Sequence, residues 1–157
     1  MKWKTLLFLL LPPLMAWGQK DKDKGKAIQS LGTKQAHYTD VAKQIWGFAE
    51  MGYLEEKSSA LLQGELSKAG FEIEKGVAGI PTAFIATYGS GKPIIGILGE
   101  FDALLGLSQE AFVPERKAIV EGAPGHGCGH NLFGTGSLAA VQRKKRTLLL
   151  ALVLGYR

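Results

Sequence analysis

Two of the three histidines and the only cysteine of the chain lie within five residues of one another, in the segment Gly125-His126-Gly127-Cys128-Gly129-His130-Asn131. Thiolate and imidazole groups are both zinc ligands. Cys128 and His130 are two residues apart, so an extended segment would direct both side chains to one side, and His126 shares this parity. The glycines would let the backbone approach an ion closely. The segment therefore indicates a metal site; a buried free cysteine in a glycine-rich turn beside a hydrogen-bonded histidine is the alternative.

A second candidate group is acidic. Glu100 and Asp102 come directly after the apolar run Pro93–Leu98, which is typical of a strand. Folds of the α/β class place their sites just past the carboxyl ends of strands. The two carboxylates share parity, so both could face the Cys128 segment. A solvated strand end is the alternative interpretation.

Three other kinds of site fit the residues less well. A thiol protease takes its histidine from a distant segment, and the one histidine outside the cluster, His37, lies on a predicted helix. The pattern Gly134-x-Gly136-x-x-Ala139 satisfies a loose dinucleotide-binding motif but follows a predicted loop rather than a strand. The Walker pattern fails because no lysine follows Gly134.

The elements that would position these residues are helices and strands in a mixed order. Apolar residues at helical spacing predict helices within residues 28–48, over Ser58–Ala69 with Gly70 as its end, and over Ser137–Val141. Alternating or β-branched apolar runs predict strands at Phe71–Glu74, Thr82–Tyr88 and Pro93–Leu98. The last two are joined at Gly89-Ser90-Gly91-Lys92, which favours a strand–turn–strand unit. We therefore expect an α/β fold with helices packed on a mixed sheet.

Composition and charge exclude several classes of protein. The 157 residues suffice for a single core, and 46% hydrophobic residues with a mean hydropathy of +0.05 argue against a disordered chain. One cysteine excludes a disulfide framework within the chain. The net charge is +5, but residues 27–142 hold eight basic and twelve acidic side chains, so the positive charge lies at the two ends. We therefore expect no nucleic-acid partner.

The N-terminus has the pattern of a secretory signal. Residues 1–4 form a short positive region with two lysines, residues 5–17 are apolar apart from Thr5, and Ala16-Trp17-Gly18 resembles a cleavage site. The apolar run is shorter than the roughly 20 residues of a membrane span. We expect residues 1–18 to be a signal peptide, residues 19–27 to be a charged mature start, and the protein to be exported, to the periplasm or outside the cell, with no stable membrane span after cleavage.

The C-terminal residues 142–157 differ from the rest of the chain. Four consecutive basic residues, Arg143–Arg146, precede a short apolar run, Thr147–Gly155, that shows neither a helical period nor a cap. Our hypothesis is that the reading frame changes near Gln142. A membrane-surface anchor and a helix that ends an intact small domain are the alternatives.

Several segments, in one order along the chain, together resemble a known family. They are Trp46–Tyr53 with Glu56 and Ser58-Ser59, Gly79–Phe84, Gly99–Leu104, and Gly125–Asn131. This pattern resembles the zinc-dependent amidohydrolases of the aminoacylase/carboxypeptidase metallopeptidase superfamily, and most closely its aminobenzoyl-glutamate hydrolase group, whose members are also called utilisation proteins. The resemblance covers residues 28–141. It implies that they form the N-terminal part of a zinc-peptidase-like catalytic domain, truncated to about the first third of the family's length.

The resemblance implies roles for individual residues. Cys128 would be a metal ligand, of the bridging kind, and His130 a second ligand. Asp102 would support the metal site. Glu100 stands where other branches of the superfamily carry a ligating histidine, and Asn131 stands where many relatives have aspartate. The roles of Glu100 and His126 stay open.

The implied reaction is hydrolysis of an amide in an N-acyl or aminobenzoyl amino acid, with release of an amino acid such as glutamate. Two divalent ions, zinc or manganese, would activate water, and a glutamate would be the general base. That base, the later ligands and a dimerising domain would lie beyond this chain, so a homodimer or a hetero-subunit partner is expected for the full-length protein. We expect the present chain to bind metal weakly and to hydrolyse nothing. The alternatives are a small exported metal-binding protein without catalysis, and a membrane-surface protein that uses residues 143–157.

Overall fold

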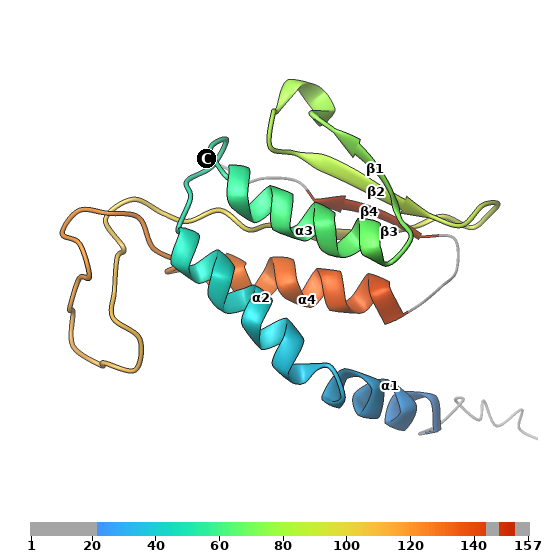
Figure 1. The fold of residues 1–157 in the computed structure, drawn as a ribbon, viewed down its shortest axis with the longest axis horizontal. Helices are drawn as coiled ribbons and strands as arrows, with labels where there is room; N and C mark the ends of the chain where they lie inside the picture. Colours follow the sequence, from blue (N-terminus) through green and yellow to red (C-terminus); the bar gives the residue numbers. More distant parts are fainter. Residues whose placement is uncertain (1–21, 144–147, 153–157) are drawn as a thin grey trace, which may run out of the picture.

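The computed structural model describes residues 22–143 and 148–152, which form a layer of helices on one face of a sheet (Figure 1). In chain order the elements are α1 (Lys22–Gly32), α2 (Gln35–Phe48), α3 (Glu56–Lys68), β1 (Glu72–Lys75), the short 3₁₀ helix η1 (Val77–Gly79), β2 (Phe84–Tyr88), β3 (Ile95–Gly99), α4 (His130–Arg143) and β4 (Leu148–Leu152). The expected α/β class is confirmed.

The sheet is mixed, with the strand order β1-β2-β4-β3. β1 pairs antiparallel with β2, and β2 pairs antiparallel with β4. β3 and β4 run parallel, with Ile95 opposite Leu148, and α4 connects them. Parallel neighbours need such a crossover connection, which is usually a helix.

The predicted strand–turn–strand unit over residues 82–98 is wrong in its pairing. Both strands exist, but β4 lies between β2 and β3. The turn residues at 89–92 report only that the chain changes direction, whereas the strand that separates β2 from β3 comes from some fifty residues later in the chain. Part of the atypical C-terminal segment is therefore a strand. The hypothesis of a frame change near Gln142 stays a prediction.

The core lies between the helices and β2. Buried apolar side chains from α2, α3, β2 and α4, and from residues next to the ends of strands, form one cluster, namely Val41, Ile45, Leu62, Leu66, Phe71, Ala83, Phe84, Ala86, Phe101, Leu138 and Val141. The helix predicted over Ser58–Ala69 is confirmed, and it ends as predicted at Gly70, whose φ is +87°. The Gly70 amide donates to Ser67 O and the Phe71 amide to Leu66 O, which is the Schellman arrangement.

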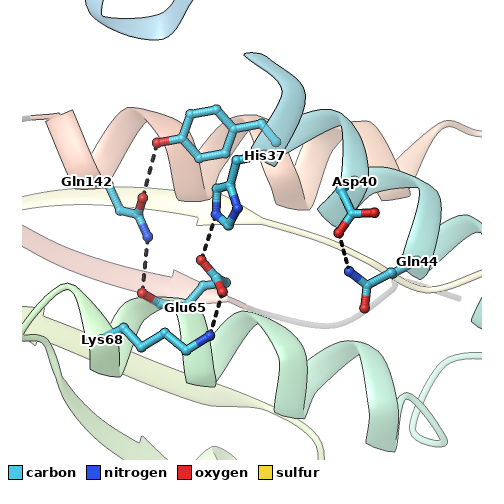
Figure 2. Close-up of polar contacts among 7 residues, drawn as sticks. His37, Asp40, Gln44, Glu65, Lys68 and Gln142 are labelled. Carbon is cyan, nitrogen blue, oxygen red and sulfur yellow. Dashed lines mark hydrogen bonds and ion pairs between the residues drawn. The ribbon is translucent and has the colours of Figure 1, made fainter. Parts of the chain in front are cut away.

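Polar contacts join α2, α3 and α4 (Figure 2). His37 Nε2 of α2 lies 2.8 Å from Glu65 Oε2 of α3, and Lys68 Nζ lies 3.0 Å from Glu65 Oε1. Tyr38 OH donates to Gln142 Oε1 of α4, and Gln142 Nε2 donates to Glu65 O. Burial alone would raise the pKa of Glu65, but the hydrogen bonds from Lys68 and His37 outweigh it and hold that pKa below its ordinary value of 4.5. His37 thus contributes to helix packing.

A second buried carboxyl group ties the start of α3 to the strand layer. Glu55 is fully buried, and its Oε2 accepts a hydrogen bond of 2.8 Å from Thr82 Oγ1. Ser59 Oγ donates to Thr82 O at 2.6 Å. Burial raises the pKa of Glu55 above its ordinary value of 4.5, and the hydrogen bond from Thr82 offsets only part of that rise.

Two expectations for the N-terminus concern residues that the structure does not describe. The predicted signal peptide, residues 1–18, lies outside the described residues, and of the predicted mature start only residues 22–27 are described, as part of α1. Among the helices in the described part of the chain, none combines the length and the apolar character that a membrane crossing needs.

Candidate metal centre

Three side chains that could bind a metal ion meet where β3 ends and α4 begins. Glu100 and Asp102 follow β3 directly, and His130 is the first residue of α4. His130 Nδ1 lies 2.7 Å from Asp102 Oδ1, and His130 Nε2 lies 3.1 Å from Glu100 Oε2. One potential ligand atom of each residue lies within 4.8 Å of the other two. The structure thus brings His130 together with two carboxylates, the nearer of which, Asp102, is 28 residues away in sequence.

The donor atoms of this cluster fit a divalent metal ion. An ionised carboxylate can only accept hydrogen bonds, so Asp102 Oδ1 accepts one from the N–H at His130 Nδ1, and a neutral ring with its proton there has its lone pair on Nε2. In that form His130 Nε2 and Glu100 Oε2, 3.1 Å apart, are two acceptors that face each other. Such a short distance requires either a proton or a metal ion between them. Histidines that ligate metals commonly donate their other N–H to a carboxylate in this way. Imidazole nitrogen with carboxylate oxygen suits zinc or manganese.

The exposure of the three side chains agrees with these roles. Asp102 is 6% exposed, whereas the side chains of Glu100 and His130 are 21% and 22% exposed. The orienting carboxylate is therefore inside the protein, and the two groups that could ligate an ion reach the surface. An ion or a water molecule could approach them from solvent.

Close packing of α4 against the end of β3 produces this geometry. A Cβ on Gly134 would lie 2.9 Å from Glu100 O and 3.2 Å from Phe101 Cβ, so only a glycine fits there without displacement. Ser137 Oγ, further along α4, donates to Leu98 O at 2.6 Å. These contacts hold the start of α4, and with it His130, beside the carboxylates.

Glu50 connects the start of α3 to the segment that follows β3 and carries Glu100 and Asp102. Its carboxylate accepts hydrogen bonds from the Lys57 and Ser58 amides and from Ser58 Oγ, and so caps the N-terminus of α3. Its backbone carbonyl accepts a hydrogen bond of 2.7 Å from the Ala103 amide. The resemblance included Glu50 in a motif, but only the structure reveals that it connects α3 to the residue after Asp102.

The segment from Gly125 to His130 is not extended, and the expectation that it would direct three side chains to one side is wrong. The Gly127 amide donates to Gly125 O, and the Gly129 amide donates to His126 O, which are turn contacts. Gly129 has a φ of +74°, a left-handed conformation that glycine adopts without strain. The turn leads directly into α4, so the alternation of a strand does not apply.

His126 bonds to α2 and, among the described residues, is not a member of the cluster of Glu100, Asp102 and His130. It is 5% exposed, its Nε2 donates to Ile45 O at 3.0 Å, and its Nδ1 has no hydrogen-bond partner among the described residues. Burial lowers the pKa of His126, and the hydrogen bond to Ile45 offsets only part of that effect, so the ring is held neutral. Asn131 Nδ2 also donates to α2, at Ala42 O. Both residues thus attach the turn to α2.

Cys128 lies at the outside of the same turn. Its side chain is exposed, and within the described part of the chain its thiol is not a member of the acidic cluster. The predicted ligand role of Cys128 is therefore still a prediction. Glu100, whose role the sequence left open, contacts His130 directly, and its two-residue spacing from Asp102 was the signal that both carboxylates would lie together.

Comparisons with known proteins agree with this fold. No family model matches the chain. Over 111 residues, 71% of this chain and 23% of the relative, the chain is 48% identical to one of the subunits of the p-aminobenzoyl-glutamate hydrolase of Escherichia coli. It is 33% identical over 93 residues to "Thermostable carboxypeptidase 1" of Saccharolobus solfataricus, again over 23% of that protein. The chain thus spans about a quarter of the length of these curated relatives.

Solved structures show the same fold. The Bacillus subtilis YXEP protein, described as a dinuclear metal binding peptidase from the M20 family, superposes with a TM-score of 0.62 at 18% identity, over 77% of this chain and 35% of that one. A protein of methicillin-resistant Staphylococcus aureus, described as an aminohydrolase, superposes with a TM-score of 0.65 over 81% of this chain and 34% of that one. Over about a quarter of their length the chain is therefore similar in sequence to a subunit of an aminobenzoyl-glutamate hydrolase and to a carboxypeptidase, and it shares its fold with part of a peptidase described as belonging to the M20 family.

Proposed function

We propose that this chain supplies part of the metal site of an exported amidohydrolase, which cleaves the amide bond of N-acyl or aminobenzoyl amino acids and releases an amino acid such as glutamate. The observation that carries the proposal is the cluster of Glu100, Asp102 and His130. The 48% identity to a protein named for hydrolysis of p-aminobenzoyl-glutamate supports the substrate class. The signal-like N-terminus supports export.

In this proposal the residues of the chain have distinct roles. His130 Nε2 and Glu100 hold a divalent ion, either zinc or manganese, and Asp102 keeps the proton of His130 on Nδ1 so that Nε2 stays available. Cys128, two residues before His130, would be a further ligand. When bound, the metal polarises the scissile carbonyl and lowers the pKa of a water molecule.

The chain alone would lack groups that the reaction requires. A catalytic zinc usually takes three protein ligands and keeps one position for water, and a second ion needs ligands of its own. The chain corresponds to 23% of the relative's length. We propose that the remaining ligands and the general base come from sequence outside the matched region, and that a second subunit assembles with the complete protein. The isolated chain then binds metal weakly and hydrolyses nothing.

A chimera tests this function. The matched segment of the Escherichia coli relative would be replaced by the corresponding residues of this chain, and release of glutamate from p-aminobenzoyl-glutamate would be measured with the other subunit of that hydrolase present. We expect the chimera to be active, His130→Ala to remove at least about 99% of the rate as expected for loss of a metal ligand, and His37→Ala, outside the cluster, to leave most of it.

The opposite result would favour the alternative. A chimera that folds and binds zinc through His130 but releases no glutamate would contradict the hydrolase proposal. The cluster would then be part of a small exported metal-binding protein without catalysis. Zinc binding that is unaffected by His130→Ala would contradict both functions.

A further inference from the structure

Leu107 lies against both glycines that precede Cys128. A Cβ added to Gly125 would overlap Leu107 O, and a Cβ added to Gly127 would overlap Leu107 Cδ1. Neither glycine has a positive φ, unlike Gly129. Their lack of a side chain is therefore required by the approach of Leu107 and not by their backbone conformation.

Backbone hydrogen bonds on both sides keep Leu107 in this place. Leu104 and Gly125 exchange two backbone hydrogen bonds, of 3.0 and 2.9 Å. The Ser108 amide donates to Ala123 O at 3.0 Å. The start and the end of the loop 105–124, which projects beyond the helices (Figure 1), thus run beside each other, with Leu107 between two fixed points.

The turn that carries Cys128 and His130 is consequently held from two directions. On one side His126 and Asn131 bond to α2, and on the other side Leu107 packs on Gly125 and Gly127. Leu107 is 42% exposed, and it does not belong to the buried core cluster. Leu107 therefore bears on the site through its contact with the turn.

We propose that Leu107 is a positioning residue for the metal centre. Its carbonyl on Gly125 and its side chain on Gly127 set the path of the turn, and thereby the positions of Cys128 and His130 relative to Glu100. The expected effect on metal affinity rests on the proposed function. The contact between Leu107 and the turn can be tested without metal. Movement of the loop 105–124 would be transmitted to the metal ligands through this side chain.

A double-mutant cycle tests the contact. Gly127→Ala adds a methyl group where Leu107 Cδ1 lies, and Leu107→Ala removes the group that it would meet, so the double variant should recover what the single variants lose. Gly125→Ala meets the carbonyl of Leu107, which Leu107→Ala retains, so that pair should show no recovery. Leu105→Ala, a neighbouring leucine that is 68% exposed, is the matched control.

Two measurements would be made on each variant. Zinc affinity by calorimetry should fall about tenfold in Gly127→Ala and in Leu107→Ala, which is the lower end of effects seen when groups around metal ligands are removed. The reaction of the single cysteine, Cys128, with a chromogenic disulfide reagent reports the turn without metal. We expect a faster reaction in both single variants, because a loosened turn exposes the thiol more of the time.

The proposal holds if the Gly127→Ala/Leu107→Ala variant returns to within about threefold of the wild type in both measurements, as coupled neighbouring sites can, while Leu105→Ala matches the wild type. It is overturned if either single variant reacts like the wild type, or if the two effects simply add. If Gly125→Ala does not fold, the double-mutant cycle between Leu107 and Gly127 is sufficient to test the contact. If the wild type binds no zinc, the proposed function fails, and the thiol reaction still decides the role of Leu107.

Discussion

At the scale of single residues, the candidate metal centre depends on Asp102 orienting His130. Asp102→Asn keeps the shape of the side chain but removes its charge, so the proton is no longer held on His130 Nδ1. We expect zinc affinity, measured by calorimetry, to fall about 10- to 100-fold, as it does when the outer partner of a ligating histidine is replaced. Asp40→Asn, an exposed aspartate that contacts only Gln44 among the residues drawn in Figure 2, is the control. Equal affinity in Asp102→Asn and the wild type would contradict the orienting role.

Glu55 gives a residue-scale prediction on pH. Burial raises its pKa in the folded protein above 4.5, so between pH 4.5 and that raised value the folded state binds more protons than the unfolded state. The free energy of unfolding therefore falls as pH rises through this window and stays lower above it. Glu55→Gln removes the cost of ionising a buried carboxyl group, so its thermal unfolding temperature should exceed that of the wild type at pH 7 and not at pH 4.

The exposed neighbour Glu56 provides the comparison, since Glu56→Gln should unfold like the wild type at both pH values. Thermal unfolding followed by circular dichroism measures all three proteins. If Glu55→Gln were less stable than the wild type at pH 7, the buried carboxyl group would be stabilising as an anion, contrary to the sign derived from its burial.

At the scale of elements, the approach of α4 to the end of β3 places His130. Gly134→Ala should force α4 away from Glu100 O, lower the free energy of unfolding by about 1–3 kcal/mol through overpacking, and weaken zinc binding. Gly136→Ala, on the same helix with no atom within 4 Å of the added Cβ, should instead stabilise the helix by about 0.5–1 kcal/mol. Chemical denaturation and zinc titration of both variants check this. Equal stability of the two would show that the helix is not in close contact there.

The elements also show which parts of the fold the sequence could predict. Local signals succeeded where the structure is locally determined, as at Gly70, whose freedom to take a positive φ ends α3. They failed for the pairing of β2 and β3, because β4, which comes after α4 in the chain, occupies the position between them. They also failed at Cys128 and His130, because the spacing alone does not reveal that α4 begins at His130.

At the scale of the whole molecule, the helices and the sheet bring one end of β3 and one end of α4 into contact, and the candidate metal centre lies at that junction (Figure 1). The class of fold followed from the order of elements along the chain, and the shared parity of Glu100 and Asp102 predicted that both could face the histidine segment. The attachment of His126 to α2 and the packing of Leu107 were not predicted, since each depends on residues distant in sequence. Each of these contacts needed the tertiary structure to be recognised.

The central claim is that Glu100, Asp102 and His130 bind a divalent metal ion, and the most direct measurement is a calorimetric titration of the chain with zinc and with manganese. We predict saturable binding of at least one of these ions, weakened at least about tenfold by His130→Ala and unchanged by His37→Ala, whose side chain contacts Glu65 instead. Absence of saturable binding, or equal binding by the wild type and His130→Ala, would contradict it.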